Sequence, residues 1–271
     1  MSAADPGYPS RAGLAGVALF AVAGAVLVAL RPAIRTGVGM MEGAVLDPVV
    51  AGVALWAGVL AYFLFSLRAE GVREEVGHGP FGPGLGIANA VTLLRGGLYA
   101  VVGGFLLVAP ASRLAWVPAA CYGAGVVLDR LDGYLARTVD RQTELGRRLD
   151  MAFDTFGFVV APAVAVAWGR LPVWYLSLSA ARYCFRGALA WRRYRGRPVY
   201  DLPDSDLGKR LAGGQMLFLT VALLPAVPAD AVALVAPLAL APSLGVFLRD
   251  YLYAAGHLGP ARPDGASPAD D

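Results

Sequence analysis

Apolar stretches long enough to cross a membrane recur along this chain and limit the folds open to it. A spanning helix needs about 20 apolar residues. The candidates are residues 13–30, 48–67, 88–109, 114–128, 151–168, 172–191, 211–227 and 229–248. Hydrophobic residues make up 57% of the 271 positions and charged ones only 16%, against about a quarter in soluble domains. The sequence therefore predicts an all-α, polytopic integral membrane protein with about eight transmembrane helices.

The predicted spans fall into two groups, separated by a charged, glycine-rich linker. We expect residues 1–80 to form a two-helix transmembrane hairpin followed by this linker, and residues 81–258 to form a six-helix unit. Residues 259–271 combine several prolines and aspartates without an apolar run, so we expect a disordered tail.

Basic residues fall mainly on one side of the predicted membrane. With an inside amino terminus and alternating spans, the inner segments hold most of them, including the run Arg192–Arg197. Because cytoplasmic loops carry the excess of Lys and Arg, this places residues 129–154 on the cytoplasmic side. The preference for Ala, Gly, Val, Leu and Arg favours a prokaryotic cell membrane.

Four aspartates lie close together, two at the end of one predicted helix and two at the start of the next: Asp129, Asp132, Asp150 and Asp154. Within each pair the spacing is three or four residues, so both members share a helix face. An Asp at the centre of a spanning helix costs about 2.5–3.5 kcal/mol, and such residues usually serve a function. Two helices that present carboxylates to a common cleft would form an all-oxygen site for two divalent cations, Mg²⁺ or Mn²⁺. Helix capping is the alternative, but a cap needs one carboxylate rather than two on one face.

The spacing resembles the CDP-alcohol phosphotransferase motif, D-x2-D-G-x2-A-R-x8-G-x3-D-x3-D. All its fixed positions are present: Asp129, Asp132, Gly133, Ala136, Arg137, Gly146, Asp150 and Asp154. Asn89, Thr92 and Arg95, at the start of the six-helix unit, are also similar to that family's first helix. The amino-terminal hairpin lies outside the resemblance.

The resemblance implies a transferase of phospholipid biosynthesis. Such an enzyme moves a substituted phosphate from a CDP-linked lipid to an alcohol and releases CMP, at a two-metal site on the cytoplasmic face. By this resemblance Asp129, Asp132 and Asp150 would hold the metals, and Asp154 would contact a metal and take the acceptor's proton. A homodimer is compatible with it, and membrane lipids are expected neighbours. We expect no nucleic-acid partner.

The other motif residues suit a nucleotide. Gly133 and Ala136 leave the helix backbone open to a phosphate or ribose, and the fork of Arg137 matches two phosphate oxygens. Thr143 in the following loop can offer a hydroxyl to the same group. Helix packing for Gly133 and a topology signal for Arg137 are the alternatives.

The residues predicted to bind nucleotide are Asn89, Thr92, Arg95, Gly133, Ala136, Arg137, Thr143 and Gly146. For the first three, a helix cap with an Arg that reaches the interface is a competing explanation.

Arg182 and Arg186, one turn apart in the span 172–191, are the best indication of the acceptor. A buried Arg requires an anion. One candidate is the phosphate of an acceptor such as glycerol 3-phosphate or an inositol phosphate, with Lys209 and Arg210 completing the pocket. The alternative is that Arg182 pairs with an aspartate of the acidic group.

Two other functions use intramembrane carboxylates. A Mg²⁺-dependent prenyltransferase also binds a pyrophosphate with Asp-rich helices, but it does not explain the Gly133–Arg137 spacing. A cation transporter tends to use broken helices or repeated halves, and we find no internal repeat in the sequence.

Overall fold

The computed structural model describes residues 48–67, 78–79, 82–83, 87–110, 114–138, 144–200, 202 and 206–258. Within these ranges the regular structure is helical, apart from the two-residue antiparallel strands β1 (His78–Gly79) and β2 (Gly82–Pro83), and turns join the helices. The predicted first span, residues 13–30, and the predicted disordered tail, residues 259–271, lie outside the described residues.

A helix covers each predicted span that falls within the described residues. The elements are α3 (Pro48–Leu67), α5 (Ile87–Gly104) with the 3-10 turn η1 (Phe105–Leu107), α6 (Val117–Thr138), α7 (Glu144–Ala167), the 3-10 turn η2 (Val173–Leu176), α8 (Ser177–Tyr194), α9 (Asp206–Ala222) and α10 (Ala229–Ala254). Among the described residues, three segments are long and apolar enough to cross a membrane: Ala90–Leu107, Leu145–Ala167 and Ala229–Ala254. The helical, membrane-type architecture is confirmed, while the number of eight spans and the first hairpin stay predictions.

α6 and α7 extend beyond their apolar stretches at one shared end. α6 continues past residue 128 to Thr138, and α7 begins at Glu144, before residue 151. Backbone hydrogen bonds continue both helices beyond their apolar residues, and the polar side chains in these extensions can face water. The predicted acidic pairs therefore lie on helices, at the end of α6 and the start of α7.

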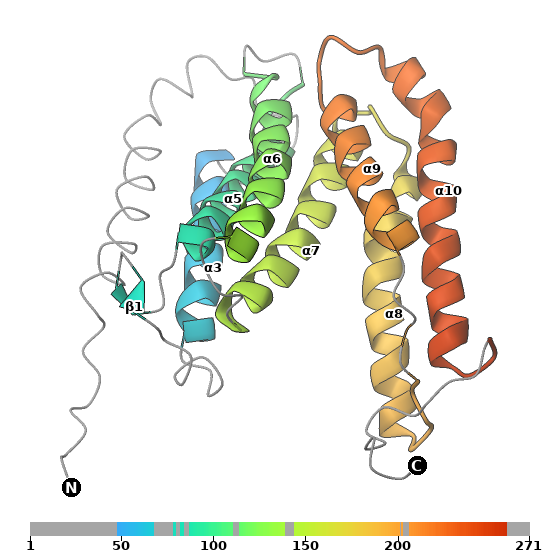
Figure 1. The fold of residues 1–271 in the computed structure, drawn as a ribbon. Coiled ribbons are helices and arrows are strands. Elements are labelled where there is room, and N and C mark those ends of the chain that lie inside the picture. The colour runs from blue at the N-terminus through green and yellow to red at the C-terminus, as the bar shows by residue number, and fades with distance from the viewer. Residues whose placement is uncertain are drawn as a thin grey trace, which may run out of the picture.

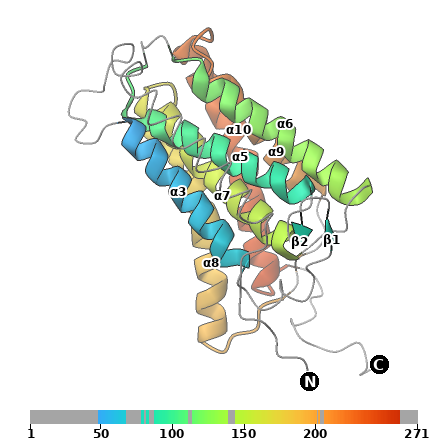
Figure 2. The same cartoon turned by 90° about the vertical axis from the view of Figure 1, so that its left-hand side faces the viewer.

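α5 is the central helix of the amino-terminal part. It packs against α3 on one side and against α6 and α7 on the other (Figure 1 and Figure 2). α8, α9 and α10 follow on the far side of α7 in Figure 1, and α9 returns to contact both α6 and α7. α7 therefore contacts α3, α5, α6, α8 and α9.

The fully buried ring of Tyr99, on α5, is wedged between glycines of two neighbouring helices. A Cβ on Gly125 of α6 would collide with this ring, and a Cβ on Gly157 of α7 would lie 2.6 Å from its Cε2. Small residues let membrane helices approach one another closely. Gly125 is four residues before Asp129, and Gly157 is three residues after Asp154. The wedge therefore fixes the separation of α6 and α7 about one turn from the aspartates.

A buried polar network joins α9 to α10 and η2. The Tyr175 hydroxyl donates to Gln215 Oε1 at 2.5 Å, and Gln215 Nε2 donates to the Ala239 carbonyl at 2.5 Å and to Ser243 Oγ at 3.0 Å. These contacts lie beside Pro242, which has no backbone N–H to contribute to α10. Each donor and acceptor of the Gln215 amide is engaged, as a buried amide requires.

Candidate metal centre

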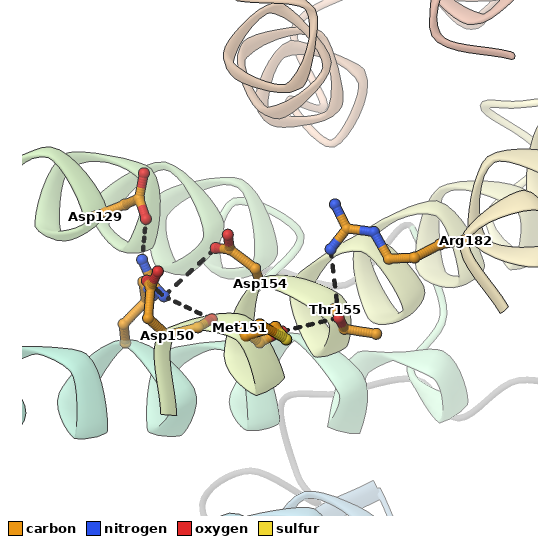
Figure 3. A network of polar contacts seen from close by, with 7 residues as sticks. Asp129, Asp150, Met151, Asp154, Thr155 and Arg182 are labelled. Atoms are coloured by element: carbon orange, nitrogen blue, oxygen red, sulfur yellow. Dashed lines mark hydrogen bonds and ion pairs between the residues drawn. The ribbon is translucent and has the colours of Figure 1, made fainter. Parts of the chain in front are cut away.

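Three of the four predicted aspartates converge in space. Asp129 from α6 and Asp150 and Asp154 from α7 each offer a carboxylate oxygen, and these oxygens lie within 4.8 Å of one another (Figure 3). The end of α6 and the start of α7 bring them together, and the one-turn spacing puts both α7 aspartates on the same face. The fourth, Asp132, belongs to α6, but its side chain lies outside the described part of the structure.

The guanidinium of Arg95 lies among these carboxylates. Arg95 is fully buried on α5 and forms an ion pair with Asp129. Its Nη2 lies 2.6 Å from Asp150 Oδ1 and 3.4 Å from Asp154 Oδ1, and it also donates to the main-chain carbonyl of Asp150 at 3.3 Å. One cation from α5 therefore contacts acids on both other helices.

The charges within this cluster do not cancel. Three carboxylates face one guanidinium, so the ionised set carries two excess negative charges. Asp154 Oδ1 is buried and accepts no hydrogen bond from any described residue, while the side chain of Asp150 is 49% exposed. An all-oxygen, acidic set with excess negative charge fits a hard divalent cation.

Arg182, on α8, lies beside the acids without pairing to them. Its Nη1 donates to Thr155 Oγ1 at 3.3 Å, and its guanidinium carbon lies 4.7 Å from the centre of the Phe158 ring. The Thr155 hydroxyl in turn donates to the Met151 carbonyl at 2.8 Å (Figure 3). Among the residues whose side chains are described, no carboxylate forms an ion pair with Arg182. The structure therefore does not pair Arg182 with Asp129, Asp150 or Asp154.

A cavity of about 190 Å³ opens next to Arg182, between α7, α8, α9 and α10. Its lining includes Phe158, Arg182, Gly208, Gln215, Ser243 and Asp250. The three other predicted acceptor residues, Arg186, Lys209 and Arg210, are exposed and do not line it. Sequence reasoning missed Asp250, because only the packing of α10 against α8 and α9 brings that residue to the cavity.

The predicted nucleotide residues are only partly described. Thr92 is buried on α5, one turn before Arg95, and Gly146 lies one turn before Asp150 on α7. The backbones of Asn89, Gly133, Ala136 and Arg137 are helical, but their side chains, like all of Thr143, lie outside the described residues. Their nucleotide contacts stay predictions. Sequence reasoning had no signal for the ion pairs of Arg95, whose partners are 34 or more positions away.

A family model described as CDP-alcohol phosphatidyltransferase matches residues 85–244, which is more than half of the chain. The chain belongs to the CDP-alcohol phosphatidyltransferase family. A search of curated proteins found no match. The resemblance predicted from the acidic motif is thus confirmed, and the matched region contains α5 to α9 together with the three convergent aspartates. α3 lies before it.

Removing the guanidinium of Arg95 tests whether it stabilises the carboxylates around it. Arg95→Ala should lower the free energy of unfolding by about 3 kcal/mol in a chelator, since it leaves buried carboxylates without a counter-charge. Added Mg²⁺ should recover part of this loss. Thermal unfolding of the detergent-purified protein, with EDTA or with Mg²⁺, measures both effects.

The control is Arg249→Ala. Arg249 pairs with Asp250 at 2.7 Å, but both side chains are partly exposed, so its removal should cost about 1 kcal/mol or less. Equal stability of the two variants in the chelator would contradict a charge-coupled cluster around Arg95.

Proposed function

We propose that this chain transfers a phosphatidyl-type group from a CDP-linked lipid to an alcohol acceptor and releases CMP. The convergence of Asp129, Asp150 and Asp154 from two helices of the family unit carries this proposal. The acids lie at the end shared by α6 and α7, where helices leave the apolar region, so a water-soluble headgroup and a membrane-held lipid tail can meet there. By the distribution of basic residues, this end faces the cytoplasm.

The residues that would hold the metal are Asp129, Asp150 and Asp154, with Asp132 as the fourth ligand from α6. Two Mg²⁺ or Mn²⁺ ions, when bound, polarise the phosphoryl oxygens and neutralise the charge of the leaving phosphate. Arg95 lies behind these acids and holds carboxylates of both helices in one place. We therefore assign Arg95 the additional role of orienting the ligands, beside its predicted nucleotide contact.

Asp154 is the proposed general base. Its Oδ1 accepts the proton of the acceptor hydroxyl, the hydroxyl oxygen forms a bond to the lipid-linked phosphorus, and the bond between that phosphorus and the oxygen of the CMP phosphate breaks. A carboxylate can do this when the hydroxyl approaches within hydrogen-bond reach. Its buried Oδ1, which accepts no hydrogen bond from a described residue, and its place nearest to the Arg182 side of the cluster support this role (Figure 3).

The nucleotide is proposed to lie along the α6 face that carries Gly133, Ala136 and Arg137, with contacts from Gly146 in the first turn of α7 and from Thr143, which precedes α7 in the sequence. Glycine and alanine leave room for a ribose or phosphate against the backbone. Arg137 binds two phosphate oxygens in this arrangement. Asn89 and Thr92, from the start of α5, complete the proposed contacts.

The acceptor is proposed to occupy the cavity beside Arg182. Arg182 lines the cavity and donates to the hydroxyl of Thr155, the neighbour of Asp154 in sequence, so this arginine connects the cavity to the proposed base. A cavity of about 190 Å³ suits a small polar molecule. Arg182 provides the cation for a phosphorylated acceptor such as glycerol 3-phosphate or an inositol phosphate, while the Ser243 hydroxyl and the Asp250 carboxylate face a polyol.

Two aspartate variants separate the proposed base from a metal ligand. Asp154→Asn should abolish CMP formation while most of the CDP-lipid binding is retained, since the amide cannot take a proton. Asp129→Asn should weaken Mn²⁺ binding itself. Turnover is measured as CMP released by purified protein in detergent over a panel of acceptors, and Mn²⁺ binding by electron paramagnetic resonance.

Retention of activity by Asp154→Asn would rule out its role as base. Release of pyrophosphate instead of CMP by the wild-type protein would favour a prenyltransferase, and metal-dependent CMP release without a sealed membrane would exclude pure cation transport.

Substitution of Arg182 tests the acceptor site. Arg182→Ala should raise the KM for a phosphorylated acceptor about 10- to 100-fold, the value of a hydrogen bond to a charged group, and leave the KM for the CDP-lipid nearly unchanged. Arg186→Ala is the matched comparison from the same helix. Because Arg186 is exposed and does not line the cavity, its effect should be several-fold smaller. Equal changes in both KM values would defeat the assignment of Arg182.

A further inference from the structure

The helix α3 lies outside the region that matches the family, yet it packs against the two helices that carry Arg95, Asp150 and Asp154. α3 ends at Leu67, and the family match begins at residue 85. α3 packs against α5 and also contacts α7 (Figure 2). α3 thus precedes the family unit in the sequence and packs against the helices that carry its acidic cluster. It can therefore influence the position of those acids.

One face of α3 is buried in a hydrophobic cluster that it shares with α5 and α7. Val59 is 6% exposed and Phe63 is completely buried. They belong to a second hydrophobic cluster, separate from the main core, whose other buried members are Leu93, Ala100, Leu145, Leu149 and Phe153. Tyr62 adds an edge-to-face contact with the Phe153 ring, at 6.3 Å between ring centres and 64° between planes.

The α7 members of this cluster are immediate neighbours of the site aspartates. Leu149 precedes Asp150, and Phe153 precedes Asp154. Leu145, Leu149 and Phe153 recur every four residues and so form one stripe along α7, and the aspartates form the adjacent stripe, one residue further around the helix. The helices that pack against this apolar stripe therefore determine the direction in which the carboxylates of Asp150 and Asp154 point.

α3 also supports α5, the helix that carries Arg95. The indole of Trp56 lies where a Cβ on Gly97 would be, and Leu55 approaches Gly103 in the same way. A Cβ on Gly96, the residue after Arg95, would lie 3.0 Å from the ring of Phe153. Phe153 of α7 thus packs against both α3 and α5, and this packing leaves little room for α5 or α7 to rotate.

We propose that α3 is a positioning helix for the metal centre. Its face formed by Val59 and Phe63 fixes the rotation of α7 about its axis and so directs Asp150 and Asp154 toward Asp129. This inference rests on the proposed metal-dependent function. It adds a structural requirement from a segment that the family match does not include.

The test compares two phenylalanines of the same helix. Phe63 is fully buried in the cluster shared by α3, α5 and α7, whereas Phe65 is 73% exposed. Phe63→Ala in the full chain should raise the dissociation constant for Mn²⁺ about tenfold, the lower end of the loss when a support of metal ligands is removed. Phe65→Ala should bind Mn²⁺ as the wild type does, and Phe63→Leu, which keeps most of the apolar volume, should recover most of the affinity. Electron paramagnetic resonance of the detergent-purified protein gives the bound fraction.

A stability control separates positioning from a general loss of structure. Leu223, the residue after the end of α9, is also completely buried but belongs to the main core. Leu223→Ala should lower the melting temperature in the chelator as Phe63→Ala does, and leave the Mn²⁺ affinity unchanged. If Phe63→Ala does not fold, Val59→Ala and Phe63→Leu take its place, with a smaller but measurable loss of affinity expected for Val59→Ala.

The outcomes distinguish the two claims. If the wild type binds Mn²⁺ and the α3 variants bind it equally well, α3 does not position the site, and the proposed function stands. If Leu223→Ala weakens Mn²⁺ binding as much as Phe63→Ala, the effect is general destabilisation, and the positioning role is overturned. If the wild type binds no Mn²⁺, the metal centre itself is wrong, and the inference about α3 falls with it.

Discussion

The grouping of three carboxylates around the guanidinium of Arg95 is the interaction on which the rest of the structure depends. Without a cation, Asp129, Asp150 and Asp154 would repel one another and drive α6 and α7 apart. Arg95 offsets one of their charges from α5 and leaves the cluster acidic. A divalent cation can neutralise the remainder and use its charge for phosphoryl transfer. The excess negative charge that destabilises the fold thus also allows the site to bind a divalent cation for phosphoryl transfer.

Apolar packing holds this charged group in place from two sides. The ring of Tyr99 sets the distance between α6 and α7 through contacts with Gly125 and Gly157. The buried stripe of α7 is docked against α3 and α5 by the second hydrophobic cluster. Because charged groups near a membrane gain little from mutual contact unless their geometry is maintained, we regard this packing as part of the site and not only as its support.

The sequence was sufficient to predict what depends on local spacing. The helices, their apolar faces and the pairing of Asp150 with Asp154 follow from periodicity, and the motif identified the family before any contact was known. The ion pairs of Arg95, the place of Asp250 at the cavity and the docking of α3 depend on residues far apart along the chain. No local pattern encodes such contacts, since they arise only when whole helices pack against one another.

The central claim is that acids from α6 and α7 bind divalent cations jointly, and anomalous X-ray scattering from crystals that contain Mn²⁺ tests it most directly. The account predicts anomalous density in contact with the carboxylate oxygens of Asp129 on α6 and of Asp150 and Asp154 on α7. Density bound by only one of the two helices, or found only elsewhere in the protein, would contradict it.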